Sequence, residues 1–333
     1  AKEEKGEYAL DNYYLGIDVG SVSTNIVLID ENNENIYKQY LRTQGKPIDM
    51  IKEGIREVAE QYGEDSINGV GCTGSGRYLA SIIVGSDVVK NEITSHAIAS
   101  LNYNPNVRTI MEIGGQDSKI IILRDGIVVD FAMNTVCAAG TGSFLDRQAI
   151  RLGIDIKDFG DYAAKSTNEV RIAGRCAVFA ESDMIHKQQL GHSQADIIKG
   201  LCHALTRNYL SNVAKGKIIQ PPIMFQGGVA ANSGIKNSFE NELKENIMVP
   251  PNYDVMGAIG AAILGKEKAK NQGFTNFKGL DLYKKNFEVK GFECSGCSNL
   301  CEVLEIVEEG TTLARYGDKC GKWSSKSPLA SGL

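Results

Sequence analysis

The stretch YLGIDVGSVSTNIVLID, residues 14–30, holds two apolar runs joined by a short turn of glycine and serine. The first run ends in Asp-x-Gly at 18–20, and the second, 25–30, is rich in branched side chains, so both are expected to be strands. Asn-Asn-Glu-Asn at 32–35 predicts a turn into a third strand at 36–41. The chain is therefore expected to open with three strands linked by tight turns.

A helix and a fourth strand complete this first half. Pro47 stands at the start of a segment with one apolar helical face, which is expected to end near Gly63. The apolar positions of that face are Ile48, Ile51, Ile55 and Val58. A strand at 68–72 follows and leads into the glycine-rich sequence TGSGR at 73–77.

The same order of elements begins again at residue 107. A strand at 107–113 ends in Gly-Gly-Gln-Asp, and strands at 119–123 and 127–131 flank the tight turn Asp125-Gly126. The later segments are a helix that begins near Gly140, a helix marked by Ile197, Ile198, Leu201, Leu205 and Tyr209, a strand at 222–225 and a Gly/Ala-rich helix at 255–264. An internal duplication of this kind predicts two α/β lobes with a cleft between them.

Glycine turns occupy equivalent places in the two halves. Asp18-Val19-Gly20-Ser21 links the first two strands, and Gly114-Gly115-Gln116-Asp117 does the same in the second half. Facing each other across a cleft, their backbone N–H groups can hold phosphate oxygens. Asp18 can bind a metal ion directly or through water, and Gly227-Gly228 allows a flat base to approach the backbone. The candidate nucleotide-binding residues are Gly20, Ser21, Ser23, Thr24, Gly114, Gly115, Gly227, Gly228 and Asn232.

Three glycine loops in this order favour a phosphate site over plain hairpin turns. The sequence has no P-loop motif, and no GxGxxG follows the first strand, which excludes the P-loop and Rossmann classes. The sequence therefore predicts a nucleotide site of a different, two-lobed kind.

Composition bounds the class of protein. The 333 residues are 42% hydrophobic and 23% charged, with a net charge of −5, which is typical of a soluble protein of two domains. This charge disfavours nucleic acid or an anionic membrane as the main partner. No apolar run approaches the roughly 20 residues that span a bilayer. The first ten residues lack an apolar signal segment, so we expect a cytoplasmic protein.

Several motifs together resemble one family. They are LGIDVGSVST, GCTGSGR, EIGGQDSK, MNTVCAAGTGSFLD, GRCAVFAESD and FQGGVAAN. This set resembles the activator (activase) component of 2-hydroxyacyl-CoA dehydratases and of benzoyl-CoA-reductase-type systems, within the actin/Hsp70/sugar-kinase ATPase superfamily. The resemblance implies an α/β fold of two duplicated ribonuclease-H-like lobes. It also implies a homodimer with ATP and Mg²⁺ in each subunit and one [4Fe–4S] cluster that bridges the subunits.

The expected domains follow from the duplication and the resemblance. The first ATPase lobe is expected at 13–104 and the second at 105–270, with its last helix returning toward the first lobe. A Cys-rich metal-binding segment is expected at 271–323, and flexible ends at 1–12 and 324–333.

The resemblance places cluster ligation on Cys137 and Cys176. Each precedes an expected helix start, where the helix dipole and free N–H groups lower a thiol pKa and stabilise an anionic cluster. A cubane cluster needs four thiolates, so two cysteines per chain make half a set and a two-fold axis supplies the rest. Gly140 and Gly142 would give the sulfides access to backbone N–H groups. The alternatives are two buried apolar residues, a disulfide, or a nucleophile at Cys137.

A second cysteine group lies near the C-terminus. Cys294, Cys297, Cys301 and Cys320 have the spacing C-x2-C-x3-C-x18-C, which predicts a tetrahedral metal site holding either Zn²⁺ or a second [4Fe–4S] cluster. The alternative is four unrelated cysteines. The segment resembles the cysteine segment of large multi-domain activases, which fits a chain that is part of a longer protein.

The function expected from these features is that of a redox ATPase. A ferredoxin or flavodoxin would supply the electron, and Gln116 and Asp117 would position the water that attacks ATP. Lobe movement would re-aim the helices behind Cys137 and Cys176. The electron would pass to an iron–sulfur dehydratase, an aryl-CoA reductase or a double-cubane protein. Glu112 stands where small family members usually carry Asp, which leaves its metal role open.

Two rival functions use the same fold. A small-molecule kinase for a sugar or carboxylate would need a catalytic base and an acceptor pocket, and it would have no use for cysteines at two helix starts. An ATP-dependent sensor or chaperone-like switch would bind nucleotide without iron. Iron content therefore separates the redox ATPase from both rivals.

Overall fold

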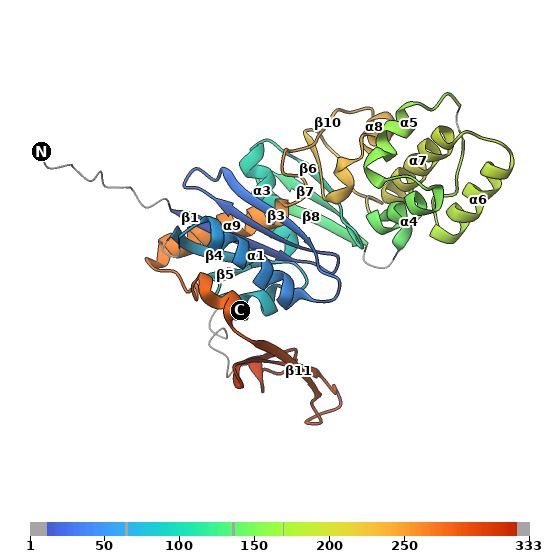
Figure 1. Cartoon of the computed structure of the whole chain (residues 1–333). Coiled ribbons are helices and arrows are strands. Elements are labelled where there is room, and N and C mark those ends of the chain that lie inside the picture. The colour runs from blue at the N-terminus through green and yellow to red at the C-terminus, as the bar shows by residue number, and fades with distance from the viewer. Residues whose placement is uncertain (1–11, 64–65, 135–136, 169, 325–333) are drawn as a thin grey trace, which may run out of the picture. The chain divides into compact units, whose positions relative to one another are not determined.

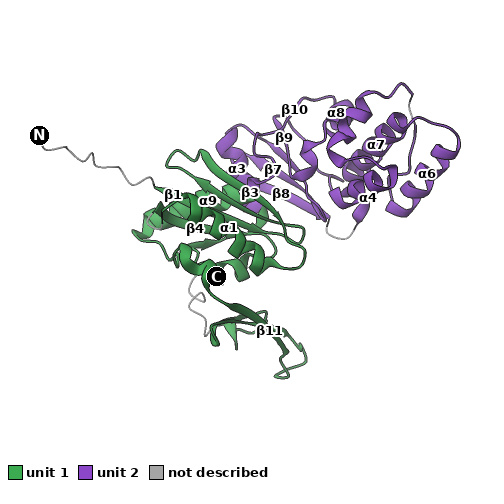
Figure 2. Ribbon diagram, viewed as in Figure 1, with its two compact units in different colours: residues 1–92, 257–333 green, residues 93–256 purple. Residues whose placement is uncertain are grey.

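The computed structural model describes residues 12–63, 66–134, 137–168 and 170–324 (Figure 1). The chain forms two compact units (Figure 2): unit 1 comprises residues 1–92 and 257–333, and unit 2 comprises residues 93–256. The lobe boundaries expected at 104 and 270 stay predictions. Apart from Asn12 and Ser324, the ends predicted to be flexible lie outside the described residues.

Unit 1 is built on a five-stranded sheet with the order β3-β2-β1-β4-β5. Its strands are β1 (Tyr13–Val19), β2 (Ser23–Ile29), β3 (Asn35–Arg42), β4 (Ile67–Thr73) and β5 (Val88–Val89). The first three strands are antiparallel, whereas β4 runs parallel to both β1 and β5. The three-stranded opening and the fourth strand predicted from the sequence are confirmed.

Unit 2 repeats this topology with the order β10-β9-β6-β7-β8. Its strands are β6 (Thr109–Ile113), β7 (Ser118–Arg124), β8 (Ile127–Asn134), β9 (Ile223–Gln226) and β10 (Ile247–Met248). Asp125 and Gly126 have φ angles of 52° and 74°, so the tight turn between β7 and β8 uses left-handed backbone as predicted. The duplicated α/β fold expected from the sequence is confirmed.

The helices are α1 (Pro47–Gln61), α2 (Arg77–Val84), α3 (Glu92–Tyr103), α4 (Gly142–Leu152), α5 (Phe159–Ala164), α6 (Ala177–Gln189), α7 (Gln194–Asn212), α8 (Ser233–Leu243) and α9 (Met256–Gln272). In unit 2 the helices α5, α6, α7 and α8 pack mainly against one another beside the sheet (Figure 1). The helix expected near Gly140 begins with the 3-10 turn η2 (Ala138–Gly140), and α4 starts at Gly142. No described helix has the length and apolar character that crossing a bilayer requires.

Close packing explains why α9 is rich in glycine and alanine. A Cβ atom at Gly16 would lie 1.9 Å from the carbonyl oxygen of Ala258, and one at Gly71 would lie 1.9 Å from that of Ala261. The backbone of α9 therefore rests directly on β1 and β4, where no larger residue fits.

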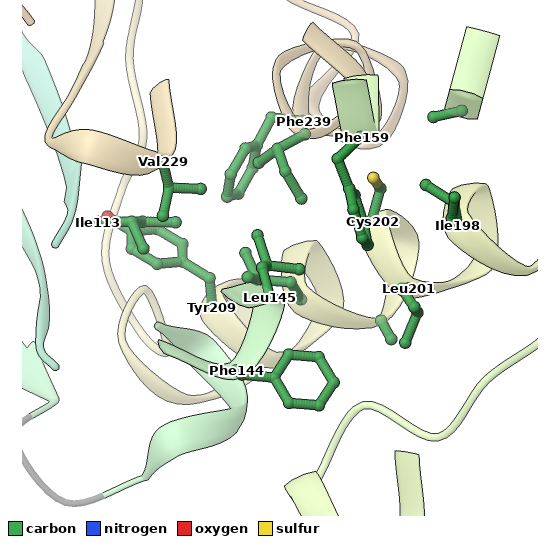
Figure 3. Packing of buried hydrophobic residues seen from close by; sticks show 14 of the residues in the cluster. Ile113, Phe144, Leu145, Phe159, Ile198, Leu201, Cys202, Tyr209, Val229 and Phe239 are labelled. Carbon is green, nitrogen blue, oxygen red and sulfur yellow. The ribbon is translucent and has the colours of Figure 1, made fainter. Parts of the chain in front are cut away.

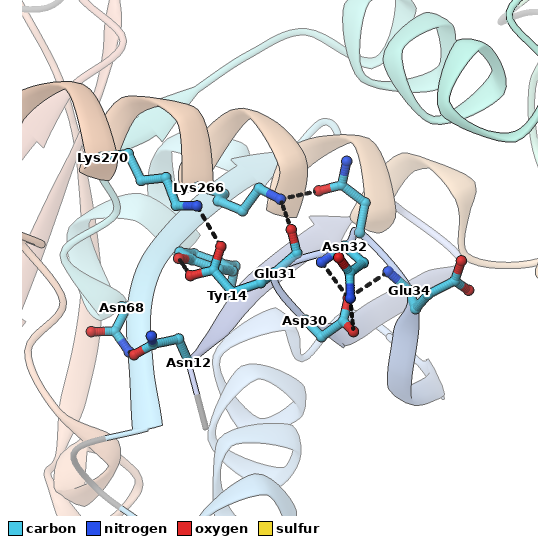
Figure 4. A network of polar contacts seen from close by, with 10 residues as sticks. Asn12, Tyr14, Asp30, Glu31, Asn32, Glu34, Asn68, Lys266 and Lys270 are labelled. Carbon is cyan, nitrogen blue, oxygen red and sulfur yellow. Dashed lines mark hydrogen bonds and ion pairs between the residues drawn. The ribbon is translucent and has the colours of Figure 1, made fainter. Parts of the chain in front are cut away.

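Polar contacts join the C-terminal part of α9 to the residues that follow β2 (Figure 4). Lys266 donates to the carbonyl oxygen of Glu31 at 2.8 Å, and Lys270 pairs with the Glu31 carboxylate. The Tyr14 hydroxyl donates to the same carboxylate at 2.5 Å. Hydrogen bonding from Lys270 and Tyr14 lowers the pKa of Glu31. The charged end of α9 continues the helix to Gln272, beyond the apolar segment predicted from the sequence.

Each unit has its own hydrophobic core. In unit 2 the core surrounds α7, where the Tyr209 and Phe239 rings meet edge to face at 5.3 Å (Figure 3). In unit 1 the strands β1 and β2 pack against α1 and α2 through residues such as Leu15, Ile17 and Ile55. The glycine loops and the cysteine loops described below belong to the two units built on these cores.

The C-terminal segment adds a small antiparallel sheet to unit 1. The 3-10 turn η5 (Leu280–Lys284) leads to β11 (Phe287–Glu293), β12 (Glu302–Glu308) and β13 (Thr311–Tyr316). Leu280, Leu282 and Phe287 belong to the unit 1 core. The sequence analysis predicted cysteines here but not this sheet.

Candidate functional site

The first glycine turn of unit 1 packs against the loop that follows β4. The Gly20 N–H donates to Ser23 O at 2.8 Å, and the Gly76 N–H donates to Val19 O at 2.8 Å. A Cβ atom at Gly74 would lie 2.4 Å from Oδ1 of Asp18. The Asp18 carboxylate therefore lies beside the TGSGR loop, at the carboxyl ends of the parallel strands β1 and β4, where α/β proteins commonly bind ligands.

The hydroxyl groups predicted around this turn differ in exposure. Ser21 is exposed and Ser23 is half-buried, so both can meet a ligand. Thr24 is fully buried, and its hydroxyl lies 3.1 Å from that of Thr43. Thr24 thus contributes to the packing of the turn, because its hydroxyl already has an internal partner.

The equivalent turn in unit 2 is bonded to the start of α4. The Gly114 N–H donates to Asp117 O at 3.0 Å, which closes the turn. The N–H groups of Gly142 and Ser143 donate to the carbonyl oxygens of Gly114 and Gly115, each at 2.8 Å. The first residues of α4 are therefore anchored on the Gly-Gly-Gln-Asp loop.

A buried ion-pair group lies beneath this loop. The Lys119 ammonium lies 2.9 Å from the Glu112 carboxylate and 2.8 Å from that of Asp117. Lys119 and Glu112 are only 2% and 5% exposed, so the low dielectric makes the pairing strong and its disruption costly. Lys119 holds Asp117, the residue predicted to position water, and it neutralises Glu112. Lys119 was not among the predicted site residues, although a lysine inside an apolar strand was a usable signal.

The third loop has one glycine that no other residue can replace. Gly227 has a φ of 87°, and its Cβ would lie 2.4 Å from Ile113 O. A Cβ at Gly228 would meet no atom within 4 Å, so the backbone there borders open space that a flat base can approach. Asn232 accepts the Ile235 N–H at 3.2 Å and caps α8.

Replacing Gly227 with alanine is expected to weaken nucleotide binding at least tenfold. The Cβ would collide with Ile113 O and with the Glu112 carboxylate at 2.6 Å, and left-handed backbone adds strain of about 1–3 kcal/mol. Calorimetric titration with ADP measures the affinity. The matched control is Gly216→Ala in the same unit, which has left-handed backbone at a φ of 75° but whose Cβ would meet no atom within 4 Å, so it should bind ADP as the wild type does. Wild-type affinity in Gly227→Ala would exclude this loop from the nucleotide site.

The two cysteine loops lie next to each other in unit 2. Cys137 precedes η2 and Cys176 precedes α6, so each stands at the N-cap position of a helical segment. The Cys137 sulfur lies 4.0 Å from the carbonyl oxygen of Arg175, although 39 positions separate the two cysteines. Both are free thiols and half-buried. Asn134 fixes the first loop by accepting the Cys137 N–H and donating to Cys137 O, both at 2.9 Å.

This arrangement fits half of a cubane site. A [4Fe–4S] cluster takes four thiolates, and the two loops present two accessible sulfurs from neighbouring helix starts. Cys72 and Cys202 do not qualify, because both are buried in the cores and burial raises the pKa of each thiol to about 12. The Gly142 N–H, predicted to be open to the sulfides, donates to Gly114 O instead, and Gly140 packs against Asn208. A role of Gly140 toward a cluster stays a prediction.

Only two of the four C-terminal cysteines lie together in one buried cluster. Cys294 and Cys301 lie in one buried cluster, and the Cys294 N–H donates to Cys301 O at 2.8 Å. Cys297 and Cys320 are exposed. Within the described residues, no three His, Cys, Asp or Glu side chains are grouped as metal ligands. The Trp323 indole N–H, 3.3 Å from the sulfur, lowers the pKa of Cys294. The metal assignment of these four stays a prediction.

The sequence profile of the BadF/BadG/BcrA/BcrD ATPase family matches residues 15–265, about three quarters of the chain. The chain belongs to this family. The family match covers both sheets, the glycine loops, Cys137 and Cys176, whereas β11–β13 lie outside it. The expectation of an ATPase within the BadF/BadG/BcrA/BcrD family is thereby confirmed.

Similar proteins support this placement. The (R)-2-hydroxyglutaryl-CoA dehydratase activating ATPase of Acidaminococcus fermentans is 35% identical over 261 residues, which cover 77% of this chain and 98% of that protein. The crystal structure of component A of the A. fermentans dehydratase has a TM-score of 0.71 and 33% identity, over 78% of this chain and 99% of that one. The 2-hydroxyisocaproyl-CoA dehydratase activator of Clostridium difficile, solved with bound ADPNP, has a TM-score of 0.72 and 31% identity, over 78% and 97% of the two chains.

Proposed function

We propose that the chain is an ATP-dependent activase. It hydrolyses ATP and passes an electron from a [4Fe–4S] cluster, shared by two copies of the chain, to an iron–sulfur partner enzyme. The names of its relatives, a dehydratase activating ATPase and a dehydratase activator, support the activator role. The observation that carries the proposal is the adjacency of the Cys137 and Cys176 loops in the unit that also holds the Gly114–Asp117 loop.

Each unit carries its own candidate nucleotide-binding residues in this proposal. Asp18, Gly20 and Ser21 serve the Mg²⁺ and phosphates from unit 1. Gly114, Gly115, Gly227 and Gly228 serve the phosphates and base from unit 2. Gln116 and Asp117 orient the attacking water, and the Lys119 ammonium fixes the Asp117 carboxylate at 2.8 Å.

Nucleotide state is coupled to the first cysteine loop through α4. The carbonyl oxygens of Gly114 and Gly115 accept the first N–H groups of α4, and Cys137 lies five residues before Gly142. A nucleotide that shifts the Gly114–Gly115 turn therefore also moves the loop that carries Cys137. ATP drives this change only if it binds one arrangement of the turn more tightly than the other arrangement, and ADP lacks this preference.

Cys137 and Cys176 hold the cluster together with the same two residues of a second copy. The bound cluster would accept and donate one low-potential electron. Both sulfurs stand directly before helical segments, and Asn134 keeps the first loop in place by accepting the Cys137 N–H. A ferredoxin or flavodoxin supplies the electron. A dehydratase, an aryl-CoA reductase or a double-cubane protein receives it.

Anaerobic purification followed by a visible spectrum and an iron count tests this function. We expect a brown protein with about four iron atoms per two chains and a broad absorption near that of a [4Fe–4S] protein. The measurement uses the chain with Cys294 and Cys301 replaced by serine, so that the C-terminal segment adds no iron. A colourless protein that binds ATP without iron would contradict the proposal and favour a kinase or a nucleotide switch.

A further inference from the structure

Asn208 of α7 contacts both cysteine loops. Its Nδ2 donates to the carbonyl oxygen of Gly174 at 2.6 Å, two residues before Cys176, and lies 4.0 Å from the sulfur of Cys137. Asn208 is only 1% exposed. Its Oδ1 lies so close to Gly140 that a Cβ there would be 2.6 Å away. One buried amide therefore holds the segments that lead into both helix starts.

The next residue, Tyr209, reaches toward the nucleotide loop. Its hydroxyl donates to the backbone carbonyl of Lys119 at 2.6 Å, and the residue is fully buried. The side chain of the same Lys119 holds Asp117. The Tyr209 ring packs edge to face on Phe239, which fixes its direction. Tyr209 thus binds the strand that supports the Gly114–Asp117 loop.

Asn208 and Tyr209 are rigidly connected, because they are neighbours in one helix. The helix α7 has 19 residues, and most of its residues between Asp196 and Tyr209 are buried in the unit 2 core. Neighbouring residues of a helix are separated by a fixed rise of about 1.5 Å, so a displacement at Tyr209 also displaces Asn208. The contacts of α4 with Gly114 and Gly115 lead to the Cys137 loop, and an ion pair of Arg151 with Glu181 at 2.7 Å joins α4 to α6. Asn208 of α7, by contrast, bonds directly to the segment that precedes Cys176.

We propose that Asn208 and Tyr209 couple the nucleotide loop to both cysteine loops, with Asn208 as the positioning residue for Cys137 and Cys176. This inference rests on the proposed function, since it presumes that nucleotide state changes the cysteine loops. Tyr209 follows any displacement of β7 through its hydrogen bond to Lys119, and Asn208 then shifts the sulfurs of Cys137 and Cys176 together. A set of ligands that must hold one cluster needs such joint movement, because independent movement would distort its geometry.

Thiol reactivity in the iron-free full chain tests the coupling without relying on electron transfer. The rates of alkylation of Cys137 and Cys176 are measured by peptide mass spectrometry with ADP and with a non-hydrolysable ATP analogue. In the wild type we expect the two nucleotides to change both rates by at least about fivefold, the lower end of ordinary coupling between sites. Tyr209→Phe keeps the ring packing but loses the hydroxyl, and it should abolish this nucleotide dependence while binding ADP normally.

The second variant separates coupling from simple folding. Asn208→Ala should make the two cysteines respond unequally to nucleotide, because the amide no longer joins their loops. Ser211→Ala is the matched control: Ser211 lies on the same helix, and its hydroxyl donates to the carbonyl oxygens of Arg207 and Asn208. This control should behave as the wild type.

The outcomes distinguish this inference from the proposed function. If neither cysteine of the wild type responds to nucleotide, the proposed nucleotide-driven movement itself is wrong. If the wild type responds and Tyr209→Phe responds equally, the proposed function survives and the role of α7 is overturned. Should Asn208→Ala fail to fold, Tyr209→Phe alone decides, because it preserves the packing against Phe239.

Discussion

Replacing Cys137 with serine is expected to remove the iron from the anaerobically purified protein and to leave ATP binding unchanged. A serine hydroxyl is a poor ligand for iron at neutral pH, and losing one sulfur per chain removes two of the four ligands of a shared cubane. The iron content should fall from about four atoms per two chains to near zero. Colorimetric iron analysis and calorimetric titration with ADP measure the two quantities, in the background without Cys294 and Cys301.

Cys202→Ala is the control for this experiment. Cys202 is fully buried on α7, and burial raises its thiol pKa to about 12, so it cannot offer a thiolate at neutral pH. Its replacement should leave the iron content intact. Cys176→Ser should reproduce the loss seen with Cys137→Ser, because the two loops lie side by side. Unchanged iron in either serine variant would overturn the assignment of these ligands.

Replacing Asp18 with asparagine is expected to slow ATP hydrolysis by about 10²-fold or more, the usual cost of removing one group that stabilises developing charge. The amide keeps the shape that fits against Gly74 but loses the negative charge that attracts Mg²⁺. Steady-state release of phosphate from the anaerobic protein measures the rate. The iron content should stay at the wild-type value, since Cys137 and Cys176 belong to unit 2.

Asp30→Asn is the matched control for Asp18→Asn. The Asp30 carboxylate accepts the N–H groups of Asn32 and Glu34, both at 2.8 Å, in the turn after β2. It belongs to the same unit as Asp18 and carries the same charge, so a general effect of charge would appear in both variants. If Asp18→Asn hydrolyses ATP at the wild-type rate, Asp18 has no part in binding the metal ion.

Local patterns were enough to predict most of the fold. Apolar runs, the turn residues around Asp125 and the proline that opens α1 act within a few positions of the chain, so the sequence reveals them directly. The repetition of this pattern predicted the duplication, and the matching strand orders of the two sheets confirm it. The helices α2, α3, α5 and α8 were missed. With eight and six residues, α2 and α5 are too short to show a helical period, and such short helices depend for their stability on the cores that they cover.

The candidate site likewise has some residues that local sequence motifs predict and others that they do not. The glycine loops and the two cysteines before helix starts were visible as motifs, and their residues lie where the sequence analysis expected turns and helix starts. Lys119 and Asn208 were missed. The lysine in an apolar strand was a local signal, although its partner Asp117 was not. An asparagine on a buried helix face gains meaning only when its partner, here Gly174, is known.

The sequence by itself determined the duplicated α/β fold, the membership of an ATPase family and the three glycine loops, because each depends on residues close together in the chain. The tertiary structure alone decided that Cys137 lies beside the Cys176 loop, and that Asn208 and Tyr209 join these loops to β7. Such contacts connect residues tens of positions apart. Their formation depends on how whole helices and strands pack, which no short stretch of sequence encodes.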